Sequence, residues 1–236
     1  MTFRYLAVLL LAVACAPKGD SNSSNVEVVS RLEQPGITLR RDGGEIYSVY
    51  VEEADWSREQ SQAVCELKTV TVIEFYNTKL ASGAIKALAD CSILRTVRFS
   101  GKTPTGGSEL LSLKDLKPLK IIGFLGSSYG DSIMGYVGQL AQLEEVYVQA
   151  DERNGSLTDS GIAAFASARN SEAPLQLFLQ GHPRITDSAF DHFGKIKGLT
   201  YIDFGEVAGV TREGIDAFAA RMKASGQTVR IAYDSR

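Results

Sequence analysis

A serine between glycines is the residue of this chain with the clearest potential for chemistry. The stretch "GSSYG", from Gly126 to Gly130, matches the pattern G-x-S-x-G, in which a serine on a sharp turn between a strand and a helix acts as a nucleophile. Such a serine needs an acid and then a histidine further along the chain. A serine hydrolase that uses Ser128 is therefore one hypothesis. Candidate acids and bases stand in that order at Asp131, Asp151, Asp159, His182 and His192.

The surroundings of Ser128 favour an ordinary loop instead. The corresponding place one segment earlier holds the unrelated residues "GKTPTGGS", from Gly101 to Ser108. His182 would also have to return across two segments to reach Ser128. We therefore expect no catalytic residue and no enzyme, and keep the serine hydrolase as the alternative.

Metal and phosphate sites have weaker support still. The residues "GKT", Gly101 to Thr103, lack the earlier glycine of a phosphate-binding loop, because Thr96 occupies its place. Neither His182 nor His192 has cysteines or carboxylates at the spacing of a zinc site. Both histidines are expected at the solvated surface, and no metal or cofactor is predicted.

Composition excludes one class of partner. The chain has 236 residues, of which 44% are hydrophobic and 22% charged, as in an ordinary globular protein. Its net charge of -3 leaves no overall positive field, and nucleic-acid binding normally needs clustered Lys and Arg. We predict no nucleic-acid partner.

Repeated segments must position whatever residues are functional. Apolar residues recur at positions one, four and six of short segments, as in Val70, Ile73 and Phe75. The first positions fall at residues 70, 94, 119, 143, 174, 199 and 228, so most steps are 24 or 25 residues. Each segment ends in strand-like alternation and is followed by apolar residues at helical spacing. The sequence therefore predicts one strand and one helix per segment.

Three similar phrases mark expected helix starts: "LTDSGIAAF", "ITDSAFDHF" and "VTREGIDAF". Thr158, Thr186 and Thr211 stand where a side-chain oxygen can accept a hydrogen bond from the first turn of a helix. One strand and one helix cannot bury an apolar face alone, but stacked copies share a continuous core.

These strand motifs and helix starts resemble the leucine-rich repeat family, in its bacterial and cysteine-containing subtypes, from about Val70 to Tyr233. The resemblance implies an α/β solenoid with a curved parallel sheet on the concave side and helices on the convex side. We assign residues 68–236 to the repeats.

A cap is expected before the first repeat, over residues 26–67. Residues Ile37 to Val51 alternate as two strands around Asp42-Gly43-Gly44, which is a strong hairpin signal. Trp56 and a helix over Glu59 to Leu67 follow. Terminal repeats of a solenoid need such a cover.

The N-terminus is typical of export. Nine apolar residues from Leu6 to Ala14 follow Arg4 and are too few to span a bilayer, so residues 1–14 are predicted to be a signal peptide. The end of this run, "AVAC", resembles the lipobox of bacterial lipoproteins. The resemblance implies a lipid, including palmitate, on Cys15 and, with Ala16 next, sorting to the outer membrane. Residues 15–25 would be a flexible tether. An ordinary secretory signal with an incidental cysteine is the alternative.

The other two cysteines allow two interpretations. Cys65 stands five residues before Val70, whereas Cys91 stands three before Leu94, so their places in the repeat differ. We expect two buried thiols, with one disulfide as the alternative in an exported protein.

An aromatic cluster is expected on the concave face, where residues between the core positions face solvent. Exposed apolar groups in a soluble domain often mark a contact site. The alternative is that aromatic residues favour strands and cover one another. The expected partner-binding residues are Arg98, Ile121, Leu125, Tyr147, Phe178 and Tyr201.

These expectations combine into one hypothesis. The chain is predicted to be a monomeric, lipid-anchored module of the bacterial envelope that binds a protein or an envelope polymer and catalyses nothing. The alternatives are the serine hydrolase and a purely structural spacer.

Overall fold

The computed structural model describes residues 24–105, 107–126, 128–150, 154–205 and 209–233. The signal peptide, the lipidation site Cys15, most of the tether and the candidate acid Asp151 lie outside the described residues.

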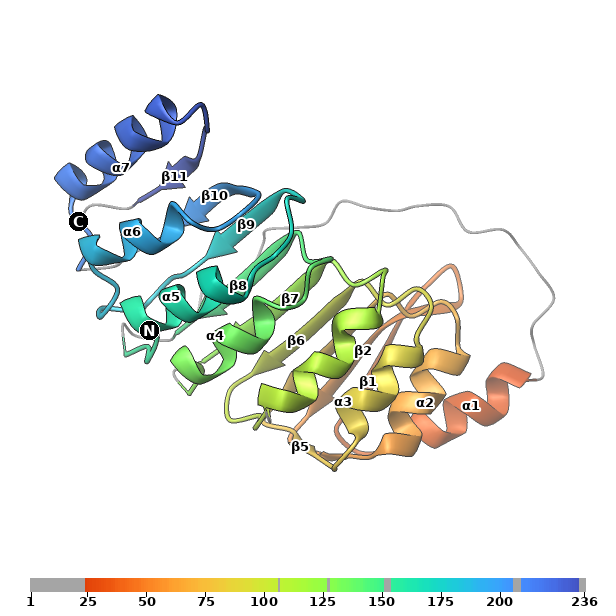
Figure 1. Cartoon of the computed structure of the whole chain (residues 1–236). Coiled ribbons are helices and arrows are strands. Elements are labelled where there is room, and N and C mark those ends of the chain that lie inside the picture. The colour runs from red at the N-terminus through yellow and green to blue at the C-terminus, as the bar shows by residue number, and fades with distance from the viewer. Residues whose placement is uncertain (1–23, 106, 127, 151–153, 206–208, 234–236) are drawn as a thin grey trace.

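The protein has a mixed α/β fold built on an open nine-stranded sheet (Figure 1). The strands lie in the order β1-β2-β4-β6-β7-β8-β9-β10-β11, and all neighbouring pairs are parallel except β1 with β2. Their bounds are Ile37–Asp42, Glu45–Glu52, Val72–Tyr76, Thr96–Ser100, Ile121–Leu125, Glu145–Gln149, Leu175–Phe178, Leu199–Asp203 and Arg230–Ala232. The short strands β3 (Asp55–Trp56) and β5 (Lys79–Leu80) form a separate pair.

Helices follow most strands and cover one face of the sheet (Figure 1). The α-helices are α1 (Ser24–Leu32), α2 (Arg58–Glu66), α3 (Ala84–Ala87), α4 (Asp131–Val137), α5 (Asp159–Ala168), α6 (Phe190–Phe193) and α7 (Arg212–Ala224). The 3-10 helices of the described residues include η1 (Leu88–Asp90), η2 (Gly107–Asp115) and η4 (Asp187–Ala189). The opposite face of the sheet carries no helix in Figure 1, and we call it the open face.

The predicted strand register is confirmed. Position four of each segment forms one row across seven neighbouring strands: Ile73, Val97, Ile122, Val146, Leu177, Ile202 and Ile231. This row faces the helices and is buried except at Ile231, which is partly buried. At position six of the segments, Phe75, Phe99 and Phe124 stack in a row, with neighbouring ring centroids 5.6 and 5.5 Å apart. One continuous core therefore lies between the sheet and the helices.

The predicted N-terminal hairpin is also confirmed. Asp42 pairs with Glu45, so only Gly43 and Gly44 form the turn. Their φ angles of 55° and 91° are the positive values that a type I′ turn requires at both places. Because β2 also pairs in parallel with β4, this region extends the main sheet.

The expected helix starts are correct for all three threonines. The side chains of Thr158, Thr186 and Thr211 accept hydrogen bonds from the backbone N–H groups of Ser160, Ser188 and Gly214. Helix α2 begins with a complete capping box, in which Ser57 and Gln60 bond reciprocally.

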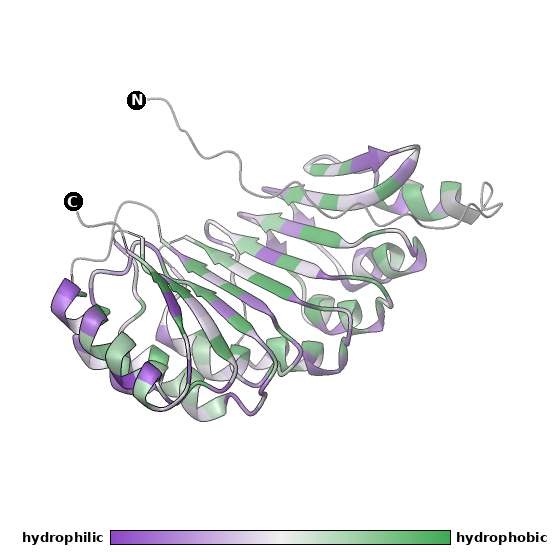
Figure 2. Ribbon diagram, turned by 90° about the horizontal axis from the view of Figure 1, so that it is seen from above, coloured by the Kyte–Doolittle hydropathy of each residue, from purple (hydrophilic) through white to green (hydrophobic). Residues whose placement is uncertain are grey.

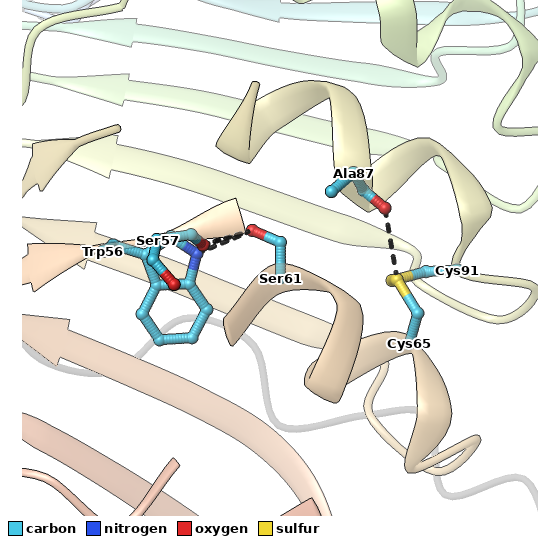
Figure 3. Close-up of a disulfide and its surroundings, with 6 residues drawn as sticks. All are labelled: Trp56, Ser57, Ser61, Cys65, Ala87 and Cys91. Carbon is cyan, nitrogen blue, oxygen red and sulfur yellow. Dashed lines mark hydrogen bonds between the residues drawn. A yellow bond between two sulfur atoms is a disulfide. The ribbon is translucent and has the colours of Figure 1, made fainter. Parts of the chain in front are cut away.

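The expectation of two buried thiols was wrong, because Cys65 and Cys91 form a disulfide (Figure 3). Cys65 lies in the last turn of α2, and Cys91 directly follows the 3-10 helix η1. A 3-10 helix rises about 2.0 Å per residue, against about 1.5 Å in an α-helix. Counting the same number of residues back from strands β4 and β6 therefore does not lead to the same height along the two helical segments. The two sulfurs meet although Cys65 and Cys91 stand at different places in the repeat.

Candidate binding face

Alternation along the strands places position-three and position-five residues on the open face. Figure 2 shows this as alternating hydrophobic and hydrophilic colour along the strands. The structure places all six predicted contact residues there, on the neighbouring strands β6, β7, β8, β9 and β10: Arg98, Ile121, Leu125, Tyr147, Phe178 and Tyr201.

The three aromatic residues form one cluster. The rings of Tyr147 and Phe178 are stacked, with centroids 4.2 Å apart and planes at 6°. The ring of Tyr201 is tilted by 57° against Phe178 at 5.4 Å. All three side chains are only partly buried. The three rings cover much of one another's surface. The part that stays accessible to a partner lies in a row across strands β8, β9 and β10.

Polar groups surround this aromatic cluster. The hydroxyl of Tyr147 donates to Oε2 of Glu145 at 2.7 Å. Burial, and then the neighbouring Glu145 carboxylate, raise the pKa of Tyr147 well above its ordinary value. The phenol is therefore neutral at physiological pH. On the other side, the guanidinium of Arg230 lies 4.8 Å from the ring centroid of Tyr201, within the range of a cation–π contact.

Arg98 is held in place rather than free in solvent. Its Nη1 lies 2.5 Å from Oε1 of Glu74. Its aliphatic stem lies over Gly123, where an added Cβ would come within 3.1 Å of the Arg98 Cγ. Ile121 and Leu125 flank Gly123 on β7 and are partly buried. These residues join the ion pair on β4 and β6 to the aromatic cluster in one surface.

A second aromatic group on the open face was missed by the sequence analysis. Tyr50 and Tyr76 lie at its N-terminal end, and the guanidinium of Arg40 is 5.5 Å from the Tyr50 ring centroid. Tyr50 lies in the hairpin, outside the repeats, and pairs in register with Glu74. Extending the alternation into β2, through Ser48, Tyr50 and Glu52, would have identified it.

Ser128 has the contacts of a loop residue. It is exposed, and its hydroxyl donates to the Gly101 carbonyl oxygen at 3.1 Å. The next residue, Tyr129, is buried and donates to the carbonyl oxygen of Thr103 at 2.6 Å. Both bonds tie this loop to the preceding one.

The prediction of a solvated His182 was wrong, since this side chain is fully buried. Its Nε2 lies 2.9 Å from the carbonyl oxygen of Val148, and its Nδ1 accepts from the N–H of Leu157 at 3.3 Å. A neutral ring that donates from Nε2 satisfies both contacts. Room for the ring comes from Gly155, where a Cβ would overlap Nδ1. The glycine and the two backbone partners explain the burial. His192, in contrast, is partly exposed.

Metal ligation and membrane crossing have no structural support in the described part of the chain. Residues 24–233, apart from the gaps stated above, contain no group of three or more His, Cys, Asp or Glu side chains placed to hold a metal ion. In the same part of the chain, every helix is too short or too polar to cross a bilayer.

The fold and the open face thus define an α/β protein with a mostly parallel sheet and a candidate contact surface on its uncovered side. No protein-family model matches the chain.

Proposed function

We propose that this protein is a lipid-anchored leucine-rich repeat module of the bacterial envelope that binds a protein or an envelope polymer through its open face. The observation that carries the proposal is the continuous aromatic and polar surface from β2 to β10, on the side of the sheet that no helix covers in Figure 1.

The repeat assignment is supported by the register of the sheet. Equivalent residues of successive segments lie in the same row, and each segment contributes one strand to the sheet. Solenoid proteins are defined by segments of this kind, which contact mainly their neighbours and share one core. An open array of strands also suits an extended or large partner better than a small molecule, which prefers a concave pocket.

Chemistry on the open face supports binding without catalysis. Aromatic rings and internally paired charges lie side by side, as in the centres and rims of protein interfaces. Arg98 is paired with Glu74, and Glu145 accepts from Tyr147, so the main charged groups are already oriented in the free protein. A preorganised surface loses less conformational freedom when it binds.

Location in the envelope is supported by two independent features. The first is the lipobox-like N-terminus ending at Cys15. The second is the disulfide Cys65–Cys91, because disulfides persist mainly in oxidising compartments such as the periplasm and the cell surface.

Cross-linking with mass spectrometry in the native host tests the binding proposal. The test variant is Tyr147→Glu with Phe178→Glu, which places two charges in the aromatic cluster. The matched control is Tyr47→Glu, because Tyr47 is an exposed tyrosine on β2 and lies outside the cluster. Both variants must keep the circular dichroism of the wild type.

A partner captured by the wild type and by Tyr47→Glu, but lost with the double variant, would support the open face as the binding site. Capture of the same species by all three proteins would contradict it. Capture of none would favour the structural spacer.

A further inference from the structure

We propose that the disulfide Cys65–Cys91 is a site of directional thiol–disulfide exchange, at which a dithiol carrier enters through Cys65. The two cysteines differ in exposure. Cys65, in the last turn of α2, is partly exposed, whereas Cys91 is only 2% exposed. An incoming thiolate must reach the sulfur that it attacks. The sulfur of the more exposed Cys65 is therefore the electrophile, and the sulfur of the buried Cys91 is the leaving group.

The surroundings of the two residues explain this difference. Next to Cys65, Glu66 is exposed and pairs with Arg31 of α1 at the surface. Cys91, in contrast, belongs to the hydrophobic core, and its N–H is bonded to the carbonyl oxygen of Leu88 at 3.1 Å. Its position is thus fixed by the backbone of η1 beneath the surface.

The exchange proceeds in two balanced steps. The thiolate of the carrier forms a bond to Cys65 Sγ, the Cys65–Cys91 bond breaks, and Cys91 leaves with the electron pair and takes up a proton. The second thiol of the carrier then attacks the mixed disulfide. Cys65 is released as a thiol, and the carrier becomes the disulfide. Two electrons have passed from the carrier to this protein, and the reverse sequence forms the bond during folding.

The structure also provides a partner for the released thiol. Cys65 Sγ lies 3.5 Å from the carbonyl oxygen of Ala87 (Figure 3). A disulfide sulfur has no hydrogen to donate, so this is only a close contact in the oxidised protein. After reduction, the Cys65 thiol can donate to that oxygen, which retains Cys65 near its oxidised position for renewed exchange.

Glutathione, acting on the wild-type full chain, tests the direction of exchange. The reaction is stopped with an excess of N-ethylmaleimide and digested with trypsin, which separates Cys65, on residues 59–68, from Cys91, on residues 87–95. We expect glutathione on Cys65 and maleimide on Cys91, in excess over the reverse product by a factor on the order of ten, since access governs attack. Equal amounts, or an excess of the reverse product, would overturn the proposal.

A pair of single variants supplies a second measurement. Cys91→Ser leaves the Cys65 thiol, and Cys65→Ser leaves the Cys91 thiol. The folded Cys91→Ser protein should react faster with a chromogenic aromatic disulfide, and the difference should vanish in urea. Equal rates in the folded state would contradict the proposal. If either variant fails to fold, the wild-type mapping alone decides.

Discussion

Asp159 holds Thr186 of the next segment with both carboxylate oxygens. Its Oδ1 accepts from the Thr186 N–H at 2.8 Å, and its Oδ2 accepts from the Thr186 hydroxyl at 2.6 Å. Asp131 binds Thr158 in the same way, and Asp187 binds Thr211. Each threonine hydroxyl also accepts a hydrogen bond from the helix that it caps, so it bonds to both segments. The repeated "TD" is therefore an interlock between neighbouring segments.

The sequence changes at both ends of this interlock. Gly130 precedes Asp131, where the later segments have threonine. Arg212 follows Thr211, where the earlier segments have aspartate, and it pairs instead with Asp216 in its own helix. Among the described residues, the series of three aspartate–threonine pairs therefore begins at Asp131 and ends at Thr211.

Removing one charge from the interlock should destabilise the fold. Asp159→Asn keeps the shape of the side chain but loses the charge-assisted bonds to Thr186, so the free energy of unfolding should fall by about 1.5–3 kcal/mol. Asp191→Asn is the control, because Asp191 forms an exposed ion pair with Arg221 and should cost about 0–1 kcal/mol. Urea denaturation measures both. Equal losses would mean that the interlock adds nothing beyond a surface pair.

Gly161 should not tolerate alanine, although alanine is the better helix former by about 1 kcal/mol. A Cβ at Gly161 would overlap Oδ1 of Asp131 and Cδ1 of Leu157. We expect Gly161→Ala to lower the melting temperature. The control Gly135→Ala, in α4, should leave it unchanged or raise it, since the nearest atom to its Cβ would be 3.9 Å away. A stabilised Gly161→Ala protein would show that the interlock can shift without cost.

Stability should fall on acidification through His182. Burial is the main cause that lowers its pKa from the ordinary value of 6.5. Above pH 6.5 the ring is neutral in both states, and the full stability is present. Below pH 6.5 the unfolded chain binds a proton that the folded ring resists, so stability is lost until the folded pKa is reached, by at most about 1.4 kcal/mol per pH unit.

Urea denaturation of the wild type and of His182→Gln between pH 7.5 and pH 5 checks this. The carboxylates titrate in both proteins, so the difference between them isolates His182. We expect the difference to shrink as the pH falls. A constant difference would show that His182 binds its proton equally well in the folded state.

Lipidation at Cys15 can be tested directly in the native host. Labelling with an alkyne analogue of palmitate should mark the wild type. The Cys15→Ser protein should carry no label and should no longer be found in the membrane fraction. The double variant Cys65→Ser with Cys91→Ser is the control and should keep the label. An unlabelled wild type that is nevertheless cleaved and exported would favour the ordinary secretory signal.

Much of the fold could be predicted because the core rows depend on local alternation. One strand and one helix separate each of Ile73, Val97 and Ile122 from the next, and this period can be recognised from the sequence alone. The open-face residues follow from the same alternation, since Tyr147 and Phe178 are each one position from a core residue.

The failures concern contacts between residues whose spacing carries no period. His182 is buried because Gly155, Val148 and Leu157 surround it, and no pattern connects these four residues. The Cys65–Cys91 disulfide depends on the pitch of a short 3-10 turn. Tyr50 was missed because it lies in the hairpin, where the register comes from β2 and not from a repeat.

The disulfide also determines how the chain carries mechanical load. The sulfur bridge spans a sequence separation of 26 residues, so a chain stretched from its ends is shorter by roughly 90 Å at full extension. Strand β4 and helix α3 lie within this span. Tension that enters at the N-terminus and reaches Cys65 therefore crosses the bridge to Cys91 and bypasses both elements. In a protein tethered at its N-terminus, strand β4 and helix α3 would be shielded from a pull on the tether.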